Sequence, residues 1–219
     1  MRLYLDSANM DDWQKCAQTG LVFGVTTNPL LAKRAGLSYS HINWSEMVGL
    51  AAQLGWHEIH IQLTESDLAS DSKASQLYAL GEAFNIDVVL KIPMNDRFIR
   101  ALPKIRQKDK KILMTACYEA KQMFVAQALR AEYIAPYFGR MIEAGLDAHN
   151  ELKTMKAIGD SCDTPCRILI ASVRSVEQMC QLARDGHDCF TLNPDLITAL
   201  VTSPFSDKAI AEFEQAARK

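Results

Sequence analysis

The chain has 219 residues, of which 48% are hydrophobic and 23% are charged, and its formal net charge is −2. These values are typical of a soluble globular protein, and the length is enough for one large domain. The weakly acidic balance argues against a general affinity for nucleic acid or for an anionic membrane, because both need a basic surface.

The N-terminal segment sets an expectation about location. It reads MRLYLDSANM, and its apolar stretch is too short for a secretory signal peptide and is interrupted by Asp6. No run of the sequence approaches the roughly 20 apolar residues of a membrane span. We therefore expect a cytoplasmic protein that binds neither membrane nor nucleic acid.

Six cysteines raise the alternative of a metal site. Cys162 and Cys166 are four residues apart, and Cys189 lies near His187. Paired Cys-x2-Cys spacing, which is typical of zinc sites, is absent. We therefore expect no metal and no cofactor, and we expect reduced thiols that pack as small hydrophobic side chains at Cys16, Cys117, Cys162, Cys166, Cys180 and Cys189.

Short apolar runs alternate with segments of helical spacing along the chain. The runs are a few residues long and several are rich in β-branched residues, which predicts buried strands. In chain order, strands are expected at residues 3–5, 21–25, 59–63, 88–92, 112–116, 133–135, 168–171 and 189–192. Helices are expected between them at residues 10–17, 66–84, 119–129, 148–158 and 176–183.

This alternation predicts an α/β protein with a parallel sheet. Strands that are almost continuously apolar are typical of a sheet buried on both faces. Eight of them in a chain of this length predict a single (β/α)8 TIM barrel over residues 1–219 with a C-terminal helix. A doubly wound open sheet is the main alternative, but no G-x-G-x-x-G fingerprint or P-loop follows a predicted strand.

Polar side chains follow most of the predicted strands. In a (β/α)8 barrel the active site lies at the C-terminal ends of the strands. These ends carry hydrogen-bonding groups together with one acid and one amine: Asp6, Thr26, Thr27, Asn28, Gln62, Thr64, Lys91, Thr115, Tyr137, Ser172, Arg174 and Asn193. Asn28-Pro29 and Asn193-Pro194 are also helix-start signals.

Lys91 is the sharpest single feature, because it lies inside the apolar run Val-Val-Leu-Lys-Ile-Pro. Burial disfavours the charged amine and should lower its pKa from about 10.4 toward neutrality. A neutral amine can attack a ketone and form an imine, which is an electron sink for breaking or making a carbon–carbon bond. The alternative is a structural lysine that pairs with a carboxylate such as Asp6 or extends to the strand end.

Asp6 and three further side chains are candidates for proton transfer. As a carboxylate near Lys91, Asp6 is suited to act as a general base, and the alternative is that it caps the next helix. Gln62, Thr115 and Tyr137 can hold a water molecule and pass on a proton, although buried hydroxyls often only satisfy their own hydrogen bonds.

Two arginines and a serine form a candidate anion site. Arg140 and Arg174 follow the sixth and seventh predicted strands, and Ser172 precedes a helix start. Helix N-termini bind anions, and barrels often bind phosphate near the seventh and eighth strands. The alternative is that both arginines are solvated surface residues.

Five motifs together carry a resemblance that covers nearly the whole chain. They are Leu-Tyr-Leu-Asp ending at Asp6, Gly-Val-Thr-Thr-Asn-Pro around Asn28, the Lys91 strand, Ala-Glu-Tyr-Ile-Ala-Pro-Tyr ending at Tyr137, and Ala-Ser-Val-Arg ending at Arg174. With them the chain resembles the small transaldolases and fructose-6-phosphate aldolases, a subfamily of the transaldolase family.

The resemblance implies a role for each matching residue. Lys91 would be the Schiff-base lysine on the fourth strand, and Asp6 the acid/base carboxylate. Thr115 would help to hold the catalytic water. Hydroxyls of the donor sugar would bind Asn28, with Thr27 beside it, and Ser172, while the substrate phosphate would bind Arg140 and Arg174. The family often assembles as rings of five or paired rings, so we expect a homo-oligomer, a pentamer or a decamer.

Two positions separate the subtypes. True transaldolases typically have Glu where this chain has Gln62 and Phe where it has Tyr137, so the pair resembles the aldolase pattern. Glutamine cannot exchange a proton as a carboxylate does, so more of the proton transfer would fall to the tyrosine hydroxyl. We therefore expect an aldolase that cleaves a ketose phosphate to dihydroxyacetone and glyceraldehyde 3-phosphate. The alternatives are a transaldolase, and a catalytically silent barrel that binds sugar phosphates.

Overall fold

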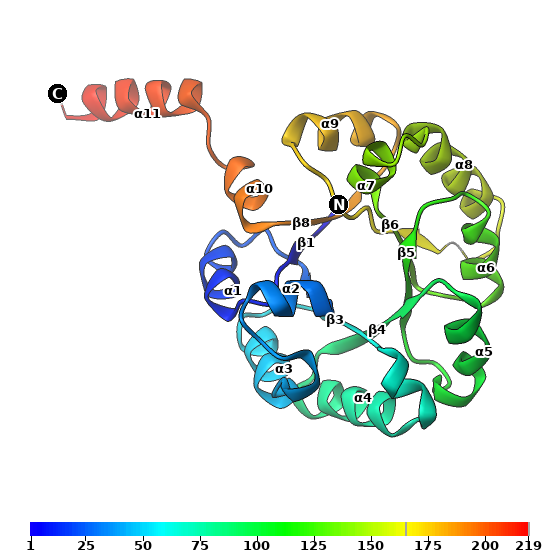
Figure 1. Cartoon of the computed structure of the whole chain (residues 1–219). Helices are drawn as coiled ribbons and strands as arrows, with labels where there is room; N and C mark the ends of the chain where they lie inside the picture. Colours follow the sequence, from blue (N-terminus) through cyan, green and yellow to red (C-terminus); the bar gives the residue numbers. More distant parts are fainter. Residues whose placement is uncertain (165, 219) are drawn as a thin grey trace.

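Eight parallel strands form one sheet that curls into a barrel in this computed structural model, which describes residues 1–164 and 166–218. Hydrogen-bonded neighbours follow the order β7-β6-β5-β4-β3-β2-β1-β8. An isolated bridge between Ile170 and Phe190 joins β8 to the segment after β7 and nearly closes the circle (Figure 1). The predicted α/β barrel is confirmed, and the open sheet is not the fold of this chain.

The strands lie at or beside the predicted runs. They are β1 (Arg2–Asp6), β2 (Gly24–Thr26), β3 (Glu58–Gln62), β4 (Asp87–Pro93), β5 (Ile112–Cys117), β6 (Tyr133–Pro136), β7 (Arg167–Ile168) and β8 (Cys189–Leu192). Two runs are shifted most: β2 begins only at Gly24, with Leu21 exposed in the preceding loop, and β7 already ends at Ile168.

The helices surround the barrel, and several of them were not predicted. They are α1 (Met10–Ala17), α2 (Pro29–Arg34), α3 (Trp44–Gln53), α4 (Ser72–Phe84), α5 (Asp96–Ile105), α6 (Gln122–Ala128), α7 (Phe138–Glu143), α8 (Ala148–Asp160), α9 (Val176–Arg184), α10 (Pro194–Ala199) and α11 (Pro204–Ala217). The single helix expected at 66–84 is in fact a 3-10 turn, η2 (Glu65–Ala69), followed by α4. A second 3-10 turn is η1 (Tyr39–His41).

The strand side chains pack into two layers. Those that point outward meet the helices in the larger apolar cluster, which includes Trp13, Ile59 and Ile134. Those that point into the barrel form a smaller cluster around Tyr4, Tyr133 and their neighbours. Because successive side chains of a strand alternate between these layers, Lys91 on β4 shares the inward face with Val89.

A buried polar network fills the base of the barrel. The Glu58 carboxylate accepts hydrogen bonds from the hydroxyls of Tyr4 at 2.7 Å and Tyr133 at 2.9 Å, and from the Lys111 amine at 2.8 Å. The Nε2 atom of His60 lies 3.0 Å from the same carboxylate. Burial opposes ionisation of Glu58, but the bonds to His60 and Lys111 outweigh it and hold the pKa of the carboxyl below its usual range.

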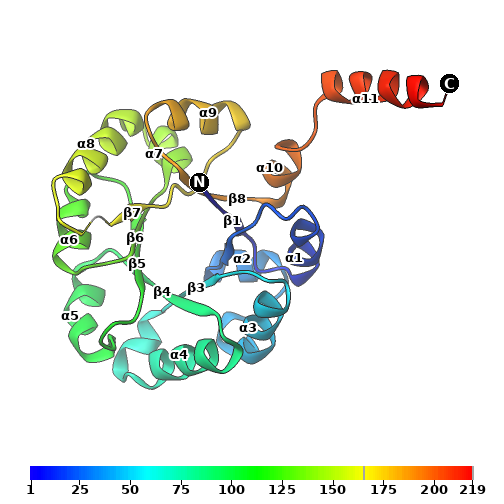
Figure 2. The same cartoon turned by 180° about the vertical axis from the view of Figure 1, so that it is seen from behind.

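The last helix stands apart from the rest of the chain. Figures 1 and 2 show α11 projecting away from the barrel, and no described residue of α11 is buried. The predicted C-terminal helix is therefore present, but it does not pack on its own barrel. Within the residues described, no helix combines the length and the apolar character that crossing a bilayer requires.

Candidate active site

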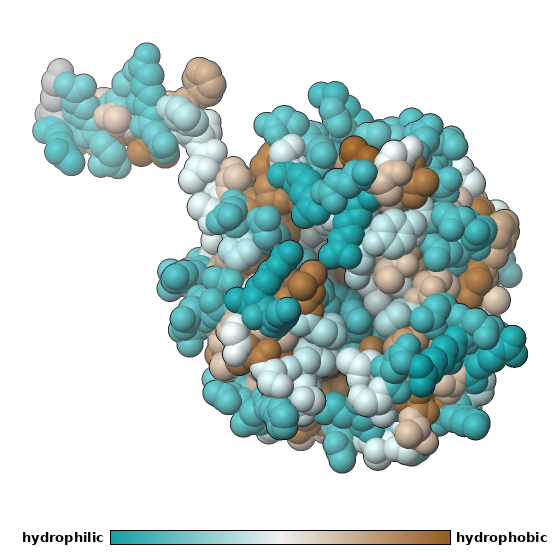
Figure 3. Space-filling model, viewed as in Figure 1, coloured by the Kyte–Doolittle hydropathy of each residue, from teal (hydrophilic) through white to brown (hydrophobic). Residues whose placement is uncertain are grey.

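The predicted site residues meet at the C-terminal ends of the strands. Ten residues were predicted to have a catalytic or substrate-binding role. One cavity there is lined by seven of them, namely Asp6, Asn28, Lys91, Tyr137, Arg140, Ser172 and Arg174. Its floor is formed by Leu113, Ala135 and Leu169 of the barrel interior. Gln62 lines an adjoining hollow that shares Asn28, Tyr137 and Arg140 with the cavity. Figure 3 shows hydrophilic side chains gathered round a hollow near the centre of this face.

Lys91 lies at the inner end of the cavity and is only 4% exposed. Its Nζ donates a hydrogen bond to the carbonyl oxygen of Thr27 at 2.8 Å. Burial, opposed in part by the charge of Asp6, lowers the pKa of Lys91 to about 8. No carboxylate of the described residues lies within ion-pair distance of the amine, so the alternative of a structural ion pair with Asp6 finds no support in the geometry.

Thr27 and Thr115 are buried and do not line the cavity. The Thr27 hydroxyl and amide both donate to the carbonyl of His60, at 3.2 Å and 3.0 Å. The Thr27 carbonyl is thereby held where the lysine amine binds it. Thr27 therefore contacts the lysine, whereas its predicted contact with substrate stays a prediction.

Asp6 ends β1 and takes part in a chain of hydroxyls. Its Oδ1 accepts a hydrogen bond from the Thr26 hydroxyl at 2.7 Å, and the Thr26 and Thr191 hydroxyls lie 2.6 Å apart. Asp6 does not cap α1, because the side chain of Asn9 accepts the bond from the amide of Asp11. The carboxylate is free of a capping role and faces the same cavity as the lysine.

Tyr137 forms a pair with Thr115 of β5, the strand beside the lysine strand. Their hydroxyls lie 2.9 Å apart. Burial raises the pKa of the Tyr137 phenol, and the hydrogen bond to Thr115 acts in the opposite direction. The phenol is therefore protonated at neutral pH and is able to donate a proton.

Ser172 occupies an unusual backbone conformation. Its φ of 64° is in the left-handed region, which is costly for residues other than glycine and occurs often at functional sites. Its carbonyl accepts a hydrogen bond from Gly139 at 3.0 Å, and a Cβ at position 139 would lie 2.2 Å from that oxygen. The Ser172 hydroxyl is buried and has no hydrogen-bond partner among the described residues, so it is available to a bound ligand.

The three arginines of the cavity differ in their partners. The guanidinium of Arg140 lies 4.9 Å from the centre of the Tyr137 ring, and Arg174 donates to Glu143 at 2.9 Å and 3.2 Å. Arg34, at the end of α2, also lines the cavity. The sequence interpretation missed Arg34 and Thr191, although their positions carried a signal. Arg34 closes the helix after Asn28-Pro29, and Thr191 interrupts the apolar run of the last strand.

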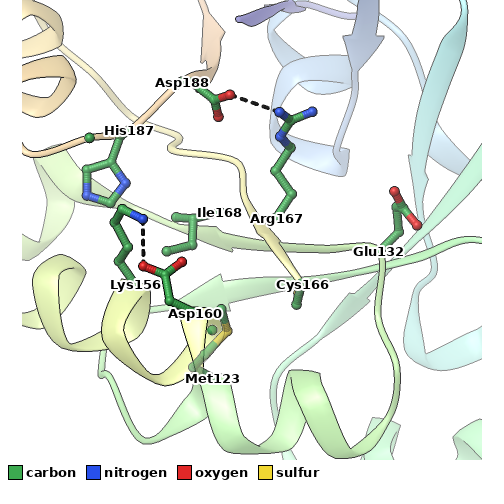
Figure 4. A pocket seen from close by; sticks show the side chains of 11 residues that line it. Met123, Glu132, Lys156, Asp160, Cys166, Arg167, Ile168, His187 and Asp188 are labelled. Atoms are coloured by element: carbon green, nitrogen blue, oxygen red, sulfur yellow. Dashed lines mark hydrogen bonds and ion pairs between the residues drawn. The ribbon is translucent and has the colours of Figure 1, made fainter. Parts of the chain in front are cut away.

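A second hollow, on the other side of the structure, has the features of a solvated surface. It lies between α8 and the beginnings of β7 and β8 (Figure 4). Four of its charged side chains pair with each other, Lys156 with Asp160 and Arg167 with Asp188, each at 2.8 Å. Across residues 1–164 and 166–218, no three His, Cys, Asp or Glu side chains are grouped so as to hold a metal ion.

Residues 3–219 match the family described as transaldolase/fructose-6-phosphate aldolase. Three curated relatives are each named probable transaldolase. The one from Phenylobacterium zucineum is 29% identical over 97% of this chain and 94% of its own. The one from Thermoplasma volcanium is 29% identical over 97% and 93%, and the one from Leptospira biflexa is 26% identical over 100% and 99%.

Solved structures also resemble the chain. A thiamine phosphate pyrophosphorylase from Pyrococcus furiosus has a TM-score of 0.60 at 11% identity, covering 90% of this chain and 87% of that one. A mandelate oxidase has a TM-score of 0.61 at 12% identity, covering 90% and 67%. At these identities the likeness extends to the fold alone.

Proposed function

We propose that this chain, which belongs to the transaldolase/fructose-6-phosphate aldolase family, is a Schiff-base enzyme that acts on sugar phosphates through Lys91. The observation that carries the proposal is the setting of the Lys91 amine. It is buried, its pKa is lowered to about 8, it is held by the Thr27 carbonyl, and it shares a cavity with Asp6. Binding alone does not require an amine in such a place, which argues against a silent barrel.

The proposed reaction begins at the ketone of a ketose phosphate. The neutral Lys91 amine adds to C2, water leaves, and a protonated imine forms. Asp6 then takes the proton of the C4 hydroxyl as the C3–C4 bond breaks. The electron pair of that bond passes into the imine and gives an enamine. Glyceraldehyde 3-phosphate leaves. Asn28 and Ser172, both in the cavity wall, are proposed to hold the hydroxyls of the three-carbon unit that remains.

The fate of the enamine decides between aldolase and transaldolase. For the aldolase, a water held by Gln62, Thr115 and Tyr137 protonates it, and hydrolysis of the imine releases dihydroxyacetone. The hydrogen-bonded pair of Thr115 and Tyr137 supports this route, because a protonated phenol is a proton donor. The names of the curated relatives favour transfer of the three-carbon unit to a second aldehyde, so transaldolase is the second candidate.

The test combines trapping with product analysis. Reduction with borohydride in the presence of fructose 6-phosphate should attach the three-carbon unit to Lys91, and mass spectrometry of the peptides locates it. The variant Lys91→Met should give no adduct. An adduct elsewhere, or none with the native chain, would refute the assignment. Release of dihydroxyacetone without an acceptor supports the aldolase, and strict dependence on erythrose 4-phosphate supports transfer.

Assembly and location complete the proposal. We propose a cytoplasmic homo-oligomer, a pentamer or a decamer, in which α11 of one copy packs against the barrel of another. The support is the apolar surface that α11 exposes: Phe205 is 87% exposed and Phe213 is 69% exposed, and the helix has no buried residue. An exposed apolar surface on an isolated helix is typical of a protein contact.

A further inference from the structure

Arginines from three separate elements line the cavity that contains Lys91. Arg140 belongs to α7, Arg174 follows β7, and Arg34 is the last residue of α2. Figures 1 and 2 agree that α2 lies over one end of the barrel, in front of the strands in the first view and behind them in the second. Arg34, the exposed last residue of this helix, lines the cavity and therefore lies toward its mouth.

The three guanidinium groups are not equally available to a ligand. Arg174 is engaged, because its Nε and Nη2 atoms both donate to Oε1 of Glu143. Neither Arg34 nor Arg140 has a carboxylate within ion-pair distance in the part of the chain that the structure describes. A guanidinium offers five N–H donors in a planar fork that matches the oxygens of a phosphate. Arg34 and Arg140 are thus the arginines whose charge is uncompensated.

The charge balance of the cavity favours an anion. Asp6 is the acidic side chain among its lining residues, against Lys91 and the three arginines. The whole chain carries a formal net charge of −2, so this basic cavity lies in a weakly acidic molecule. A cleft lined by one sign of charge raises the local concentration of ligands of the opposite sign.

The backbone of Arg34 is tied to the anchor of the lysine through α2. Asn28 caps α2, because its Oδ1 accepts hydrogen bonds from the amides of Leu30 at 2.9 Å and Leu31 at 3.0 Å. The residue before Asn28 is Thr27, whose carbonyl holds the Lys91 amine. The six residues of α2 therefore connect the anchor of the lysine directly to Arg34.

We propose that Arg34 is a specificity-determining residue that forms, together with Arg140, the subsite for the phosphate of the sugar substrate. The inference rests on the proposed function, because it places the phosphate relative to the imine carbon. In a ketose 6-phosphate, four carbon–carbon bonds separate C2 from C6. The phosphate of a substrate joined to Lys91 through C2 therefore lies toward the mouth, where Arg34 is. Dihydroxyacetone has no phosphate and does not reach this subsite.

The test compares Arg34→Ala with Lys33→Ala. Lys33 is a matched control, because it is an exposed cation on the same helix that does not line the cavity. For fructose 6-phosphate cleavage, Arg34→Ala should raise KM about tenfold or more with kcat changed less than about twofold, since it removes charge-assisted bonds made alike in ground and transition states. Lys33→Ala should stay within about twofold of the native KM. Arg34→Lys should restore part of the loss, because it keeps the charge but not the planar fork.

A second readout separates this inference from the proposed function. Reductive trapping of Lys91 with dihydroxyacetone should proceed at the native rate in Arg34→Ala. The inference is overturned if Arg34→Ala and Lys33→Ala have the same KM, or if Arg34→Ala slows trapping by dihydroxyacetone as much as it weakens use of fructose 6-phosphate. If the native chain neither cleaves the sugar phosphate nor forms an adduct, the proposed function fails. The subsite is then tested by calorimetric titration with inorganic phosphate. Arg34→Ala must lower the affinity for phosphate, and Lys33→Ala must leave it unchanged.

Discussion

Burial accounts for the lowered pKa of Lys91. The side chain is 4% exposed, and its amine contacts a neutral carbonyl where a carboxylate would have stabilised the charge. The charge of Asp6 opposes the shift without reversing it. Since a pKa near 8 leaves a useful fraction of neutral amine at physiological pH, the residue is able to act as a nucleophile without a separate base.

This pKa predicts the pH dependence of imine formation. The neutral amine reacts, so the rate of trapping by dihydroxyacetone and cyanoborohydride should rise about tenfold per pH unit below about pH 8 and level off above it. The measurement is the initial trapping rate across that range, with Lys91→Met as the blank. A midpoint near the ordinary value for lysine, about 10.4, would show that burial does not tune this amine.

At Tyr137 the prediction concerns the second half of the reaction. Tyr137→Phe removes the phenol that we propose helps to protonate the enamine through a held water, and it leaves the ring under Arg140. Release of dihydroxyacetone should fall about 100-fold, as expected for the loss of a general acid, while the Lys91 adduct still forms. Tyr118→Phe is the control, because that ring packs edge-on against Tyr137 at 5.7 Å and also lines the adjoining hollow. Equal rates in the two variants would remove Tyr137 from the proton transfer.

Side-chain caps fix the starts of the helices that surround the site. Asn28 and Asn193 each cap a helix with their side chains, as their sequence contexts predict, and Ser175 caps α9 in the same way. The start of α7 has a steric requirement that the sequence alone does not show. Gly139 must lack a Cβ there, because the Ser172 carbonyl lies where that atom would be. The strained Ser172 and the close approach of α7 together shape the wall of the cavity.

The base of the barrel gives a prediction about stability. Glu58→Gln removes the charge that pairs with Lys111 and weakens the acceptor for Tyr4 and Tyr133, in a site where the carboxylate is 1% exposed. Breaking a buried pair of this kind should cost roughly 3 kcal/mol of the free energy of unfolding at pH 7. Urea unfolding measures it, and Asp87→Asn is the control because Asp87 contacts the same lysine at the surface.

The sign of the pH effect follows from the direction of the shift. The folded pKa of Glu58 is lowered, so its stabilisation is fully present above the unfolded value of about 4.5 and is lost as the pH falls below it. The difference between the native chain and Glu58→Gln should therefore shrink in acid. A difference that stays constant down to about pH 3 would mean that the charge of Glu58 contributes nothing.

For the whole molecule, the question is what covers α11. The helix contacts no described part of its own barrel closely enough to bury a residue, and its exposed phenylalanines are unfavourable in water. A second copy of the chain is the occupant that we propose. The double substitution Phe205→Ser with Phe213→Ser should then reduce the mass measured by light scattering from that of an oligomer to that of smaller species.

The control for this experiment is an apolar residue exposed on the barrel itself. Phe124 on α6 is 62% exposed, so Phe124→Ser removes a similar side chain without touching α11. It should leave the mass unchanged. If the native chain is monomeric at micromolar concentration, or if both variants have the same effect, the proposed role of α11 in assembly is wrong.

The sequence by itself determined the alternation of strands and helices, because period and composition are local properties of the chain. It also singled out Lys91 and Asp6, because a charged residue inside an apolar run or at its end stands out without any knowledge of the fold. Helices α3, α5 and α7 were not predicted, and of α2 only the Asn-Pro start was. With six residues each, α2 and α7 are too short to carry a clear periodic pattern.

Only the tertiary structure decided which groups meet. Thr26 and Thr191 are 165 residues apart in sequence yet hydrogen-bonded beside Asp6, and Tyr4, Glu58 and Tyr133 come together only because their strands share the barrel interior. The same closure brings Arg34 to the cavity and leaves Lys91 without an acidic partner among the described residues. The physical reason is that burial and pairing depend on neighbours in space, which the linear pattern does not contain.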